Sequence, residues 1–484
     1  LHFIEDDITR NAMTQGLSFE DYLKQVGQTK EDWEKEATKI AEARVKASLA
    51  LQILAKNEGI TVDNGISAVE EAQYIKQLEM DMIVTDHHLP GEQLPAAAVI
   101  VNPKVASPPA LSDLCGAAVA FLLAGELVHA ARAVKLYDGP SLAGPLLVLA
   151  GLATVTDVMP VLGQNRILVA EALSRFRQLA PIGLKELYDR ATRTGALKLS
   201  TKDFGFLLGP RINAAGRLAS AQDALELLLT ADRELARDKA RIVDERNTAR
   251  KETERQMLSA ALAQVVSGAS AQVIDLPDGH PGVAGIVAAR VMEQLVPKVP
   301  VGVVVGAHGS ARAPEGYQVR DALAACSDSL ERFGGHALAA GFSVKSGAID
   351  AFRTQFGAAC AAQRQALPEK ADGLQADAWI KPDELTLELA ADVAKLEPFG
   401  ERNPEPVFGF RAVVPKEVRP LGAEGKHLAM TAHGFKAVWW NHGEQVEALR
   451  AGLRPADVTF TVEISTYGSE HVELKIIAME EVHA

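Results

Sequence analysis

The sequence feature that most constrains the fold is a short apolar run, residues 82–85, that ends abruptly in Asp86-His87-His88 and a Leu-Pro-Gly turn. Apolar runs bounded by turn signals are typical of buried strands, and α/β proteins place ligands at the carboxyl ends of such strands. Two adjacent imidazoles beside a carboxylate are suited to a metal or phosphate site. The alternative is an ordinary strand end whose histidines hydrogen-bond the following turn.

The stretches around this strand alternate between strand and helix patterns. Residues 60–66 form a β-branched run that contains Asp63, residues 67–78 have a helical pattern, and residues 98–103 are another apolar run. Strands that alternate with helices predict parallel βαβ units, whose consecutive strands end at one edge of the sheet. We therefore expect Asp63 and the Asp86-His87-His88 cluster to lie at the same sheet edge.

Residues 112–200 are rich in alanine and leucine and are mostly helical in pattern. Within them, Asp157 stands among apolar residues shortly before Pro160. A buried carboxylate must be paired or must bind a metal. The local pattern does not decide between a functional aspartate and a carboxylate that caps a turn or a helix.

Residues 202–217 carry Arg211 and Arg217 on either side of Asn213, between glycines. Arginines in a glycine-flanked turn suit phosphate, because the guanidinium is a fork of hydrogen-bond donors. The alternative is a surface salt bridge. A long charged helix is predicted next, over residues 232–265, as a connector between two lobes.

Residues 270–365 are predicted to form a second α/β lobe. Residues 271–275 and 301–305 are strand-like and enclose a helix that begins near Val283. Gly282 and Gly285 have no side chain, so a ligand can approach the backbone closely at the start of this helix, where free N–H groups attract anions. We expect a second glycine loop at residues 333–336.

The C-terminal hundred residues predict a β-domain. Five short strands are expected, at residues 407–414, 427–432, 436–440, 458–464 and 472–478. This pattern suits an OB-type barrel, a fold that often binds single-stranded nucleic acid. Trp439 and Trp440 are adjacent, so on a strand they would face opposite sides, with one of them in the core. A purely structural β-domain is the alternative.

Composition narrows the class of protein. The chain has 484 residues, 48% hydrophobic residues and a formal net charge of −13. That length suits about three domains. The charge argues against a non-specific polycation but not against nucleic-acid binding, which depends on where the charges lie. The three widely spaced cysteines give no disulfide framework or zinc site and favour a reducing compartment. We expect no signal peptide and no membrane-spanning apolar run.

Several motifs occur in a fixed order. They are residues 61–65 (TVDNG), 84–90 (VTDHHLP), 152–160 (LATVTDVMP), 209–217 (GPRINAAGR), 280–286 (HPGVAGI), 309–312 (GSAR) and 333–337 (FGGHA). From about residue 60 to the end, the chain resembles the DHH phosphoesterase superfamily, and specifically the RecJ-type exonucleases specific for single-stranded DNA. Several ordered motifs make this resemblance far more specific than the Asp-His-His triplet alone.

The resemblance implies roles for individual residues. Asp63, His87 and Asp157 are expected to bind a pair of divalent ions, Mn²⁺ or Mg²⁺, and imidazole favours Mn²⁺. His88 is expected to contact the scissile phosphate, and Asp86 to orient the histidines. The expected contacts with DNA are Arg211, Asn213, Arg217, His280, Arg290, Ser310, Arg312 and His336.

The resemblance also implies a multidomain α/β architecture. We expect an incomplete DHH parallel-sheet lobe over residues 60–200 and a substrate motif with connector helix over 201–268. A DHHA1 α/β lobe over 269–366 and an OB-like β-barrel over 374–484 are expected to follow. Residues 1–59 are expected to be all-helical.

The N-terminal segment departs from the RecJ pattern. Residues 16–24 and 42–59 resemble a fragment of the C-terminal chaperone domain of trigger factor. RecJ-type enzymes begin their catalytic lobe with a strand that ends in Asp-x-Asp-x-Asp-Gly, whose aspartates bind the metals. No such motif precedes Asp63. We expect its loss to impair hydrolysis.

The resemblance therefore implies a metal-dependent 5′→3′ exonuclease on single-stranded DNA, acting in recombination and repair in the bacterial cytoplasm. By the same resemblance, single-strand-binding protein and a recombination helicase are the expected partners, and no membrane is expected. One alternative is a catalytically weak protein that binds single-stranded nucleic acid. Another is a DHH phosphoesterase acting on small nucleotides, against which the C-terminal domain argues.

Overall fold

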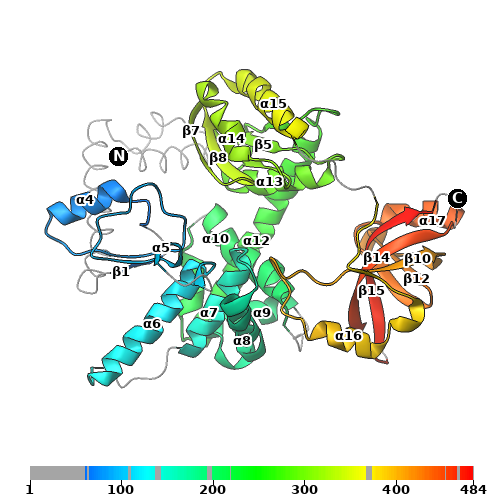
Figure 1. The fold of residues 1–484 in the computed structure, drawn as a ribbon, viewed down its shortest axis with the longest axis horizontal. Helices are drawn as coiled ribbons and strands as arrows, with labels where there is room; N and C mark the ends of the chain where they lie inside the picture. Colours follow the sequence, from blue (N-terminus) through cyan, green and yellow to red (C-terminus); the bar gives the residue numbers. More distant parts are fainter. Residues whose placement is uncertain are drawn as a thin grey trace. The chain divides into compact units, whose positions relative to one another are not determined.

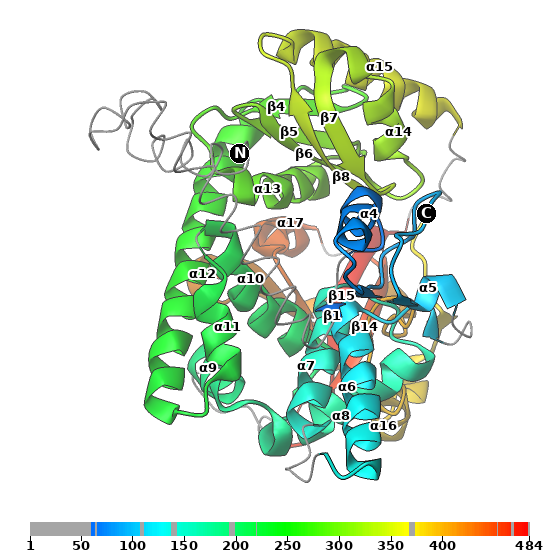
Figure 2. The ribbon, with the colours of Figure 1, turned by 90° about the vertical axis from the view of Figure 1, so that its left-hand side faces the viewer.

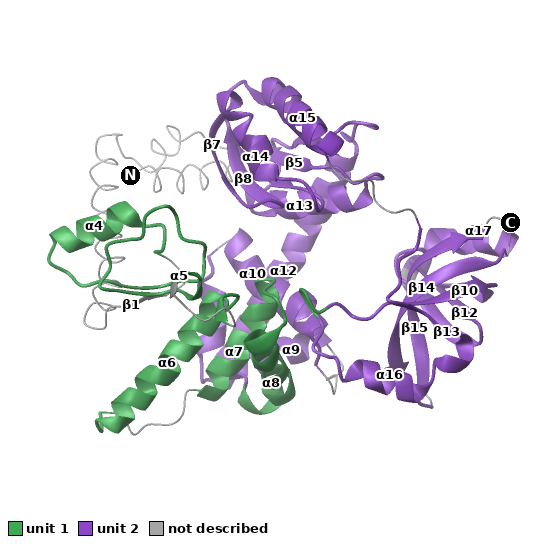
Figure 3. Cartoon of the chain, in the orientation of Figure 1, with its two compact units in different colours: residues 1–179, 400–403 green, residues 180–399, 404–484 purple. Residues whose placement is uncertain are grey.

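The computed structural model describes residues 60–62, 65–106, 111–136, 143–192, 199–218, 220–366, 373–452, 454–465 and 469–482. The helical segment expected over residues 1–59 and the expected metal ligand Asp63 lie outside these ranges. The chain divides into two compact units, coloured separately in Figure 3. The first unit comprises residues 1–179 and 400–403, and the second comprises residues 180–399 and 404–484.

The first unit contains a three-stranded parallel sheet in the order β1-β2-β3. Its strands are β1 (Ile60–Val62), β2 (Ile83–Thr85) and β3 (Val99–Val101), and α4 (Val69–Gln77) connects the first two. Val62 pairs with Thr85, which pairs with Val101, so all three strands end in register. The predicted parallel sheet is confirmed, and the Asp86-His87-His88 cluster follows its central strand.

Among the described residues of this unit, the helices that follow are α5 (Pro103–Ala106), α6 (Gly116–Ala133), α7 (Ala143–Thr156) and α8 (Gly163–Leu179). α7 and α8 pack closely because Gly151 has no side chain. A methyl group there would lie 2.3 Å from Cβ of Ala172. This tight pair fixes the loop between the two helices, residues 157–162, which carries Asp157.

One expectation about the helices is corrected. Within the described ranges, α6 is long and apolar enough to cross a membrane by length and composition, although no such run was expected. A single helix of this kind is weak evidence of a membrane span, since core helices of soluble proteins meet the same criterion.

The second unit begins with a helical module, which Figures 1 and 2 show around the long helix α12. Its elements are α9 (Ile182–Thr192), the π-helix η2 (Asp203–Leu208), α10 (Gly209–Leu218), α11 (Gln222–Leu229) and α12 (Arg233–Leu262). The long charged helix is confirmed, and the Asp232 carboxylate caps it by accepting the N–H groups of Glu234 and Leu235. Residues 209–217 were expected to be a turn, but they lie in α10.

The second α/β lobe has a five-stranded sheet in the order β4-β5-β6-β8-β7. The strands are β4 (Gln272–Asp275), β5 (Val301–Val305), β6 (His308–Arg312), β7 (Leu330–Gly335) and β8 (Ala339–Val344). The helices are α13 (Pro281–Gln294), α14 (Val319–Ala324), η3 (Ser327–Ser329) and α15 (Ile349–Ala366). Val301, Val303 and Val305 pack with α13, whereas Val304 packs with α14 and α15. Helices therefore cover both faces of the sheet.

The glycine loop expected at residues 333–336 is not a separate loop. Phe333, Gly334 and Gly335 belong to β7, and His336 begins the hairpin turn to β8.

The C-terminal domain has seven strands in one sheet, ordered β11-β12-β13-β15-β14-β10-β9. They are β9 (Ala378–Trp379), β10 (Phe408–Val413), β11 (Lys416–Leu421), β12 (His427–Ala432), β13 (Phe435–Trp439), β14 (Ala456–Ser465) and β15 (His471–Glu481). The helical elements are η4 (Pro382–Glu384), α16 (Leu387–Ala394), η5 (Ala423–Gly425), η6 (Gly443–Gln445) and α17 (Val446–Ala451).

This domain differs from a closed barrel. Among the strands described, the edges β9 and β11 do not pair with each other, so the sheet stays open. Phe410 and Phe460 fill its core, and Trp439 packs against that core. Trp440 is 48% exposed, so the expected division between the two tryptophans is confirmed.

Candidate active site

Asp86 is the structural centre of the strand-end cluster. Its Oδ2 accepts the N–H of Ile66 (3.0 Å), and its Oδ1 accepts the N–H groups of His87 (2.7 Å) and His88 (3.1 Å). The same Oδ1 lies 2.7 Å from Nδ1 of His88. Burial alone would raise the pKa of this carboxyl group, but the hydrogen bonds outweigh burial and lower the pKa. Asp86 is therefore a buried, ionised anchor that fixes the backbone and one ring of the histidine pair.

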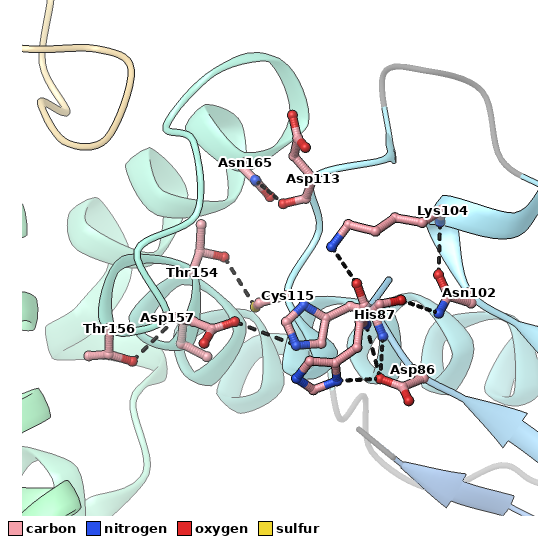
Figure 4. Close-up of polar contacts among 12 residues, drawn as sticks. Asp86, His87, Asn102, Lys104, Asp113, Cys115, Thr154, Thr156, Asp157 and Asn165 are labelled. Carbon is pink, nitrogen blue, oxygen red and sulfur yellow. Dashed lines mark hydrogen bonds and ion pairs between the residues drawn. The ribbon is translucent and has the colours of Figure 1, made fainter. Parts of the chain in front are cut away.

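His87 and Asp157 face each other across the first unit, as Figure 4 shows. Nε2 of His87 lies 3.6 Å from Oδ2 of Asp157. The His87 ring is buried, whereas the Asp157 side chain is 48% exposed. Asp157 was expected to be buried, and this is wrong because it follows the last turn of α7 and reaches solvent. The pair therefore consists of a buried imidazole and a solvent-accessible carboxylate.

His88 lies beside His87 but is far more exposed. Its ring is exposed, and the two ring centroids are 4.3 Å apart at an interplanar angle of 52°. Because Asp86 holds Nδ1, the Nε2 atom of His88 is the ring nitrogen left to meet a ligand. The tautomer follows from this contact, since a carboxylate accepts the proton on Nδ1.

Asn102 and Lys104 support the two histidines from the end of β3. The side chain of Asn102 donates to the carbonyl of His88 (3.0 Å), and Nζ of Lys104 donates to the carbonyl of His87 (2.5 Å). The N–H of Lys104 in turn donates to Oδ1 of Asn102 (2.8 Å). Sequence reasoning missed both residues. The sequence signal that could have identified them is Asn102-Pro103, a polar residue and a proline directly after an apolar strand.

The loop that carries Asp157 has its own supports. Asn165, a buried residue of α8, donates to the carbonyls of Asp113 (2.7 Å) and Pro160 (3.0 Å).

Cys115 is a buried residue near this loop, and its Sγ lies 3.6 Å from Oγ1 of Thr154. Burial, together with the negative charge of Asp157, raises the pKa of the Cys115 thiol, although hydrogen bonds oppose this. Cys115 is therefore a neutral packing residue rather than a metal ligand.

The donors brought together suit a divalent cation in part. Imidazole and carboxylate are donors for Mn²⁺, and carboxylate suits Mg²⁺. No group of three or more potential ligands forms among the residues that the structure describes. The third expected ligand, Asp63, lies outside them. The His87–Asp157 pair thus fits part of a metal centre.

Two arginines in the second unit form a separate cationic site. Arg217 lies in the last turn of α10, and its Nη1 donates to the carbonyl of Gly282 (3.1 Å). Arg312 ends β6, and its Nη1 donates to the carbonyl of Ala311 (2.8 Å). Neither guanidinium pairs with a carboxylate within the described ranges.

The charges of these arginines are mutually unfavourable. Partial burial and the charge of Arg250 lower the pKa of Arg217. Burial and the charge of Arg217 lower the pKa of Arg312. A bound anion would relieve this repulsion, and guanidinium groups bind phosphate well.

Glycines and short side chains leave room around the two arginines. A methyl group on Gly285 would lie 2.7 Å from Nη2 of Arg312 and 3.2 Å from Oγ of Ser310. On Gly282 it would lie 2.3 Å from the carbonyl of Arg217. Nδ1 of His280 accepts the N–H of Gly282 (3.1 Å) and caps α13. The expected residues Arg217, His280, Ser310 and Arg312 therefore surround the start of α13.

Two other predicted contacts lie at accessible positions. Asn213 is exposed on α10. His336 is exposed in the β7–β8 turn, where its N–H donates to the carbonyl of Ala339 (2.8 Å). Ala339 pairs with Arg312 across the strands, so this turn borders the arginine site.

Arg211 and Arg290 do not join this site. Nε of Arg211 donates to Asp244 (2.9 Å), and its Nη1 donates to the carbonyl of Leu207 (2.8 Å). Arg290 pairs with Glu254 and Glu293. Arg211 and Arg217 were both expected to contact DNA, but they have different partners, because six residues on a helix place two side chains on different faces.

Family models match three parts of the chain. They are the DHH family, N-terminal domain, over residues 9–147, the DHHA1 domain over residues 268–362 and the RecJ OB domain over residues 376–478. The single-stranded-DNA-specific exonuclease RecJ of Bacillus subtilis (strain 168) is 32% identical over 418 residues, which cover 82% of this chain and 50% of that protein.

Solved structures agree with these matches. RecJ from Thermus thermophilus in complex with Mn²⁺ has a TM-score of 0.76 at 33% identity, covering 88% of this chain and 62% of that one. Its complex with Mg²⁺ has a TM-score of 0.71 at 30% identity, covering 90% of this chain and 70% of that one. The chain belongs to the RecJ family. It spans about half the length of the curated RecJ relatives it matches first.

Membership of the RecJ family confirms the resemblance and the three expected domain types. The DHH match begins at residue 9, upstream of residue 60 where that domain was expected to begin. Because residues 1–59 lie outside the described ranges, the boundary and the trigger-factor resemblance stay predictions.

Proposed function

We propose that this chain is a metal-dependent 5′→3′ exonuclease on single-stranded DNA that acts in recombination and repair. The observation that carries the proposal is the His87–Asp157 pair at the end of a parallel sheet, in a chain whose other domains match RecJ. The phosphodiester bond of DNA is the substrate bond, and water is the nucleophile. The bacterial cytoplasm is the proposed location.

His87 and Asp157, with Asp63, would hold the divalent cations, Mn²⁺ or Mg²⁺. Such ions neutralise the phosphate and make bound water more acidic. The solved RecJ structures include complexes with each of these metals. Asp86 fixes His88 so that its exposed ring meets the scissile phosphate, and Asn102 and Lys104 hold the backbone carbonyls beneath it.

The second unit would bind the DNA. Arg217 and Arg312 supply positive charge that no described carboxylate neutralises, and Ser310, His280, Asn213 and His336 supply polar contacts nearby. Arg211 and Arg290 would contribute only if DNA displaced their acidic partners. In the OB domain, exposed Trp440 offers a surface on which a base can stack. Single-strand-binding protein and a recombination helicase are the proposed partners.

A second candidate rests on one feature of the sequence. The 484 residues contain no Asp-x-Asp-x-Asp-Gly motif. The chain would then bind single strands through its DHHA1 and OB domains and hydrolyse them weakly. The C-terminal OB domain argues against a third candidate, a phosphoesterase for small nucleotides.

The proposal is tested with end-labelled DNA. Purified chain is incubated with Mn²⁺ and single strands labelled at the 5′ or the 3′ end, with duplex DNA as the control. We expect early release of the 5′ label from single strands and little release from duplex. Salt-sensitive binding without release would support the second candidate, and neither binding nor release would overturn both.

A further inference from the structure

Residues 400–403 form a short closed loop, which we call the strap. The N–H of Gly400 donates to the carbonyl of Asn403 (2.9 Å), and the N–H of Asn403 donates back to the carbonyl of Gly400 (3.1 Å). The strap belongs to the first unit, although the chain on both sides of it belongs to the second. Phe399, the residue before it, packs on the core of the C-terminal domain.

The strap contacts Val161 through backbone and side chain. The N–H of Val161 donates to the carbonyl of Glu401 (2.8 Å). A methyl group on Gly400 would lie 2.6 Å from Cγ2 of Val161, a distance that real Cβ atoms essentially never show. Val161 is 1% exposed, so its side chain has little space to move away. Only glycine fits at residue 400 without displacing Val161.

Val161 lies in the same loop as Asp157. In this loop Val158 has a left-handed backbone (φ +56°), which is strained for a β-branched residue and persists only where its surroundings enforce it. The N–H of Met159 donates to the carbonyl of Thr154 (3.0 Å), and Asn165 holds the carbonyl of Pro160. The strap is a further restraint on this loop, near its end at Leu162.

We propose that the strap is a positioning element that holds Asp157 against His87 through Val161. The proposal rests on the proposed function in one respect, namely that Asp157 is a metal ligand. It assigns Gly400 and Glu401, which lie outside the DHH domain match, an indirect part in the catalytic centre. Neither residue is proposed to touch the substrate or the metal.

The test uses the full chain with Gly400→Ala, Val161→Ala and the double variant. Gly125→Ala in α6 is the matched control, because a methyl group there meets nothing within 4 Å. The first readout needs no metal. It is amide hydrogen exchange at Val161 and Met159, at single-residue resolution.

We expect Gly400→Ala to lower protection of both amides by roughly tenfold or more. Val161→Ala removes the atoms that the new methyl group would strike, so the double variant should regain protection. Loss of protection at Val161 with full protection at Met159 would overturn the proposal, because the strap would then not control the Asp157 turn. Unchanged protection at both would also overturn it.

The second readout is Mn²⁺ affinity, measured by electron paramagnetic resonance. We expect Gly400→Ala to weaken Mn²⁺ binding by about tenfold, because removal of a residue that supports a metal ligand has an effect of this size. The double variant should recover the Mn²⁺ affinity of wild type. In an Asp157→Asn background, Gly400→Ala should have no further effect. If Gly400→Ala weakened Mn²⁺ binding as much in the Asp157→Asn background as in wild type, the proposal would be contradicted. If wild type binds no Mn²⁺, the proposed function fails, while hydrogen exchange still decides the role of the strap.

Discussion

Nε2 of His87 lies 3.6 Å from Oδ2 of Asp157, although one residue follows a β-strand and the other follows helix α7. A buried imidazole and an accessible carboxylate at this distance can share a cation. They can also form a simple ion pair if the imidazole is protonated. Metal binding by variants separates these two possibilities.

Asp157→Asn should weaken Mn²⁺ binding by at least about tenfold, because it removes a charged oxygen donor and leaves the side-chain size unchanged. Titration of metal-free chain followed by electron paramagnetic resonance measures this. Asp113→Asn is the matched control, since the side chain of Asp113 is exposed in the same unit. Equal Mn²⁺ affinity in both variants would show that the pair is only a structural contact.

Asp86 should make the stability of the first unit sensitive to acid. Its pKa in the folded chain is below the ordinary value of 3.8, so its stabilising contribution is fully present above that value and is lost as the pH falls through the folded pKa. Asp86→Asn should lower the free energy of unfolding at pH 7 by about 1–3 kcal/mol, because an amide N–H₂ cannot accept the N–H of Ile66 or His87.

Denaturant unfolding between pH 7 and pH 3 tests this effect of Asp86. The difference between wild type and Asp86→Asn should shrink as the pH falls below about 4. A constant difference across this range would mean that the carboxylate charge does not stabilise the fold. Asp81→Asn, at an exposed position before β2, is the control.

The sequence predicted the parts of this site that depend on local pattern. The apolar run at residues 82–85 and the polar triplet after it identified a strand end, and parallel pairing placed it beside β1 and β3. The long helix after Asp232 was also clear, because its N-cap and charge pattern are local signals. Ordered motifs then connected Asp157 to the same centre.

Other parts could not be predicted because they depend on tertiary contacts. The bond from Lys104 to the carbonyl of His87 requires knowledge of how the chain turns after β3. Arg211 and Arg217 look alike in sequence, and only the phase of α10 sends one to Asp244 and the other to Gly282. The contact of Glu401 with Val161 joins segments far apart in the chain, with no motif of its own.

Arg217 and Arg312 should act in DNA binding, unlike Arg211. Alanine at Arg217 or Arg312 should weaken binding to single-stranded DNA and reduce the dependence of log K on log salt concentration by about 0.7 for each phosphate that the variant no longer neutralises. Fluorescence anisotropy at several salt concentrations measures both. If both variants kept the wild-type affinity and salt slope, the arginine site would not be part of the DNA interface.

Arg211→Ala should instead affect stability. Arg211 is 12% exposed and is bonded to Asp244, which also pairs with Arg190. Its loss should lower the free energy of unfolding by about 1–3 kcal/mol, with DNA affinity little changed. A large loss of DNA affinity with unchanged stability would restore the sequence-based expectation for this residue.

The three cysteines should be unreactive in the folded chain. All three are buried, and burial raises the pKa of Cys326 to about 11 and that of Cys360 to about 12. Since the thiolate is the reactive form, labelling with a thiol reagent at pH 7–9 should be slow until denaturant is added. Rapid labelling of Cys326 or Cys360 in native chain would contradict the packing of the second α/β lobe.

The most direct test of the central claim is release of nucleotides from 5′-labelled single-stranded DNA in Mn²⁺ by wild type and by His87→Ala. We expect metal-dependent release by wild type, at a low rate because the 484 residues contain no Asp-x-Asp-x-Asp-Gly motif. Release should fall by more than about 100-fold in His87→Ala, with single-strand binding retained. Equal release by the two proteins would show that the strand-end cluster is not the catalytic centre.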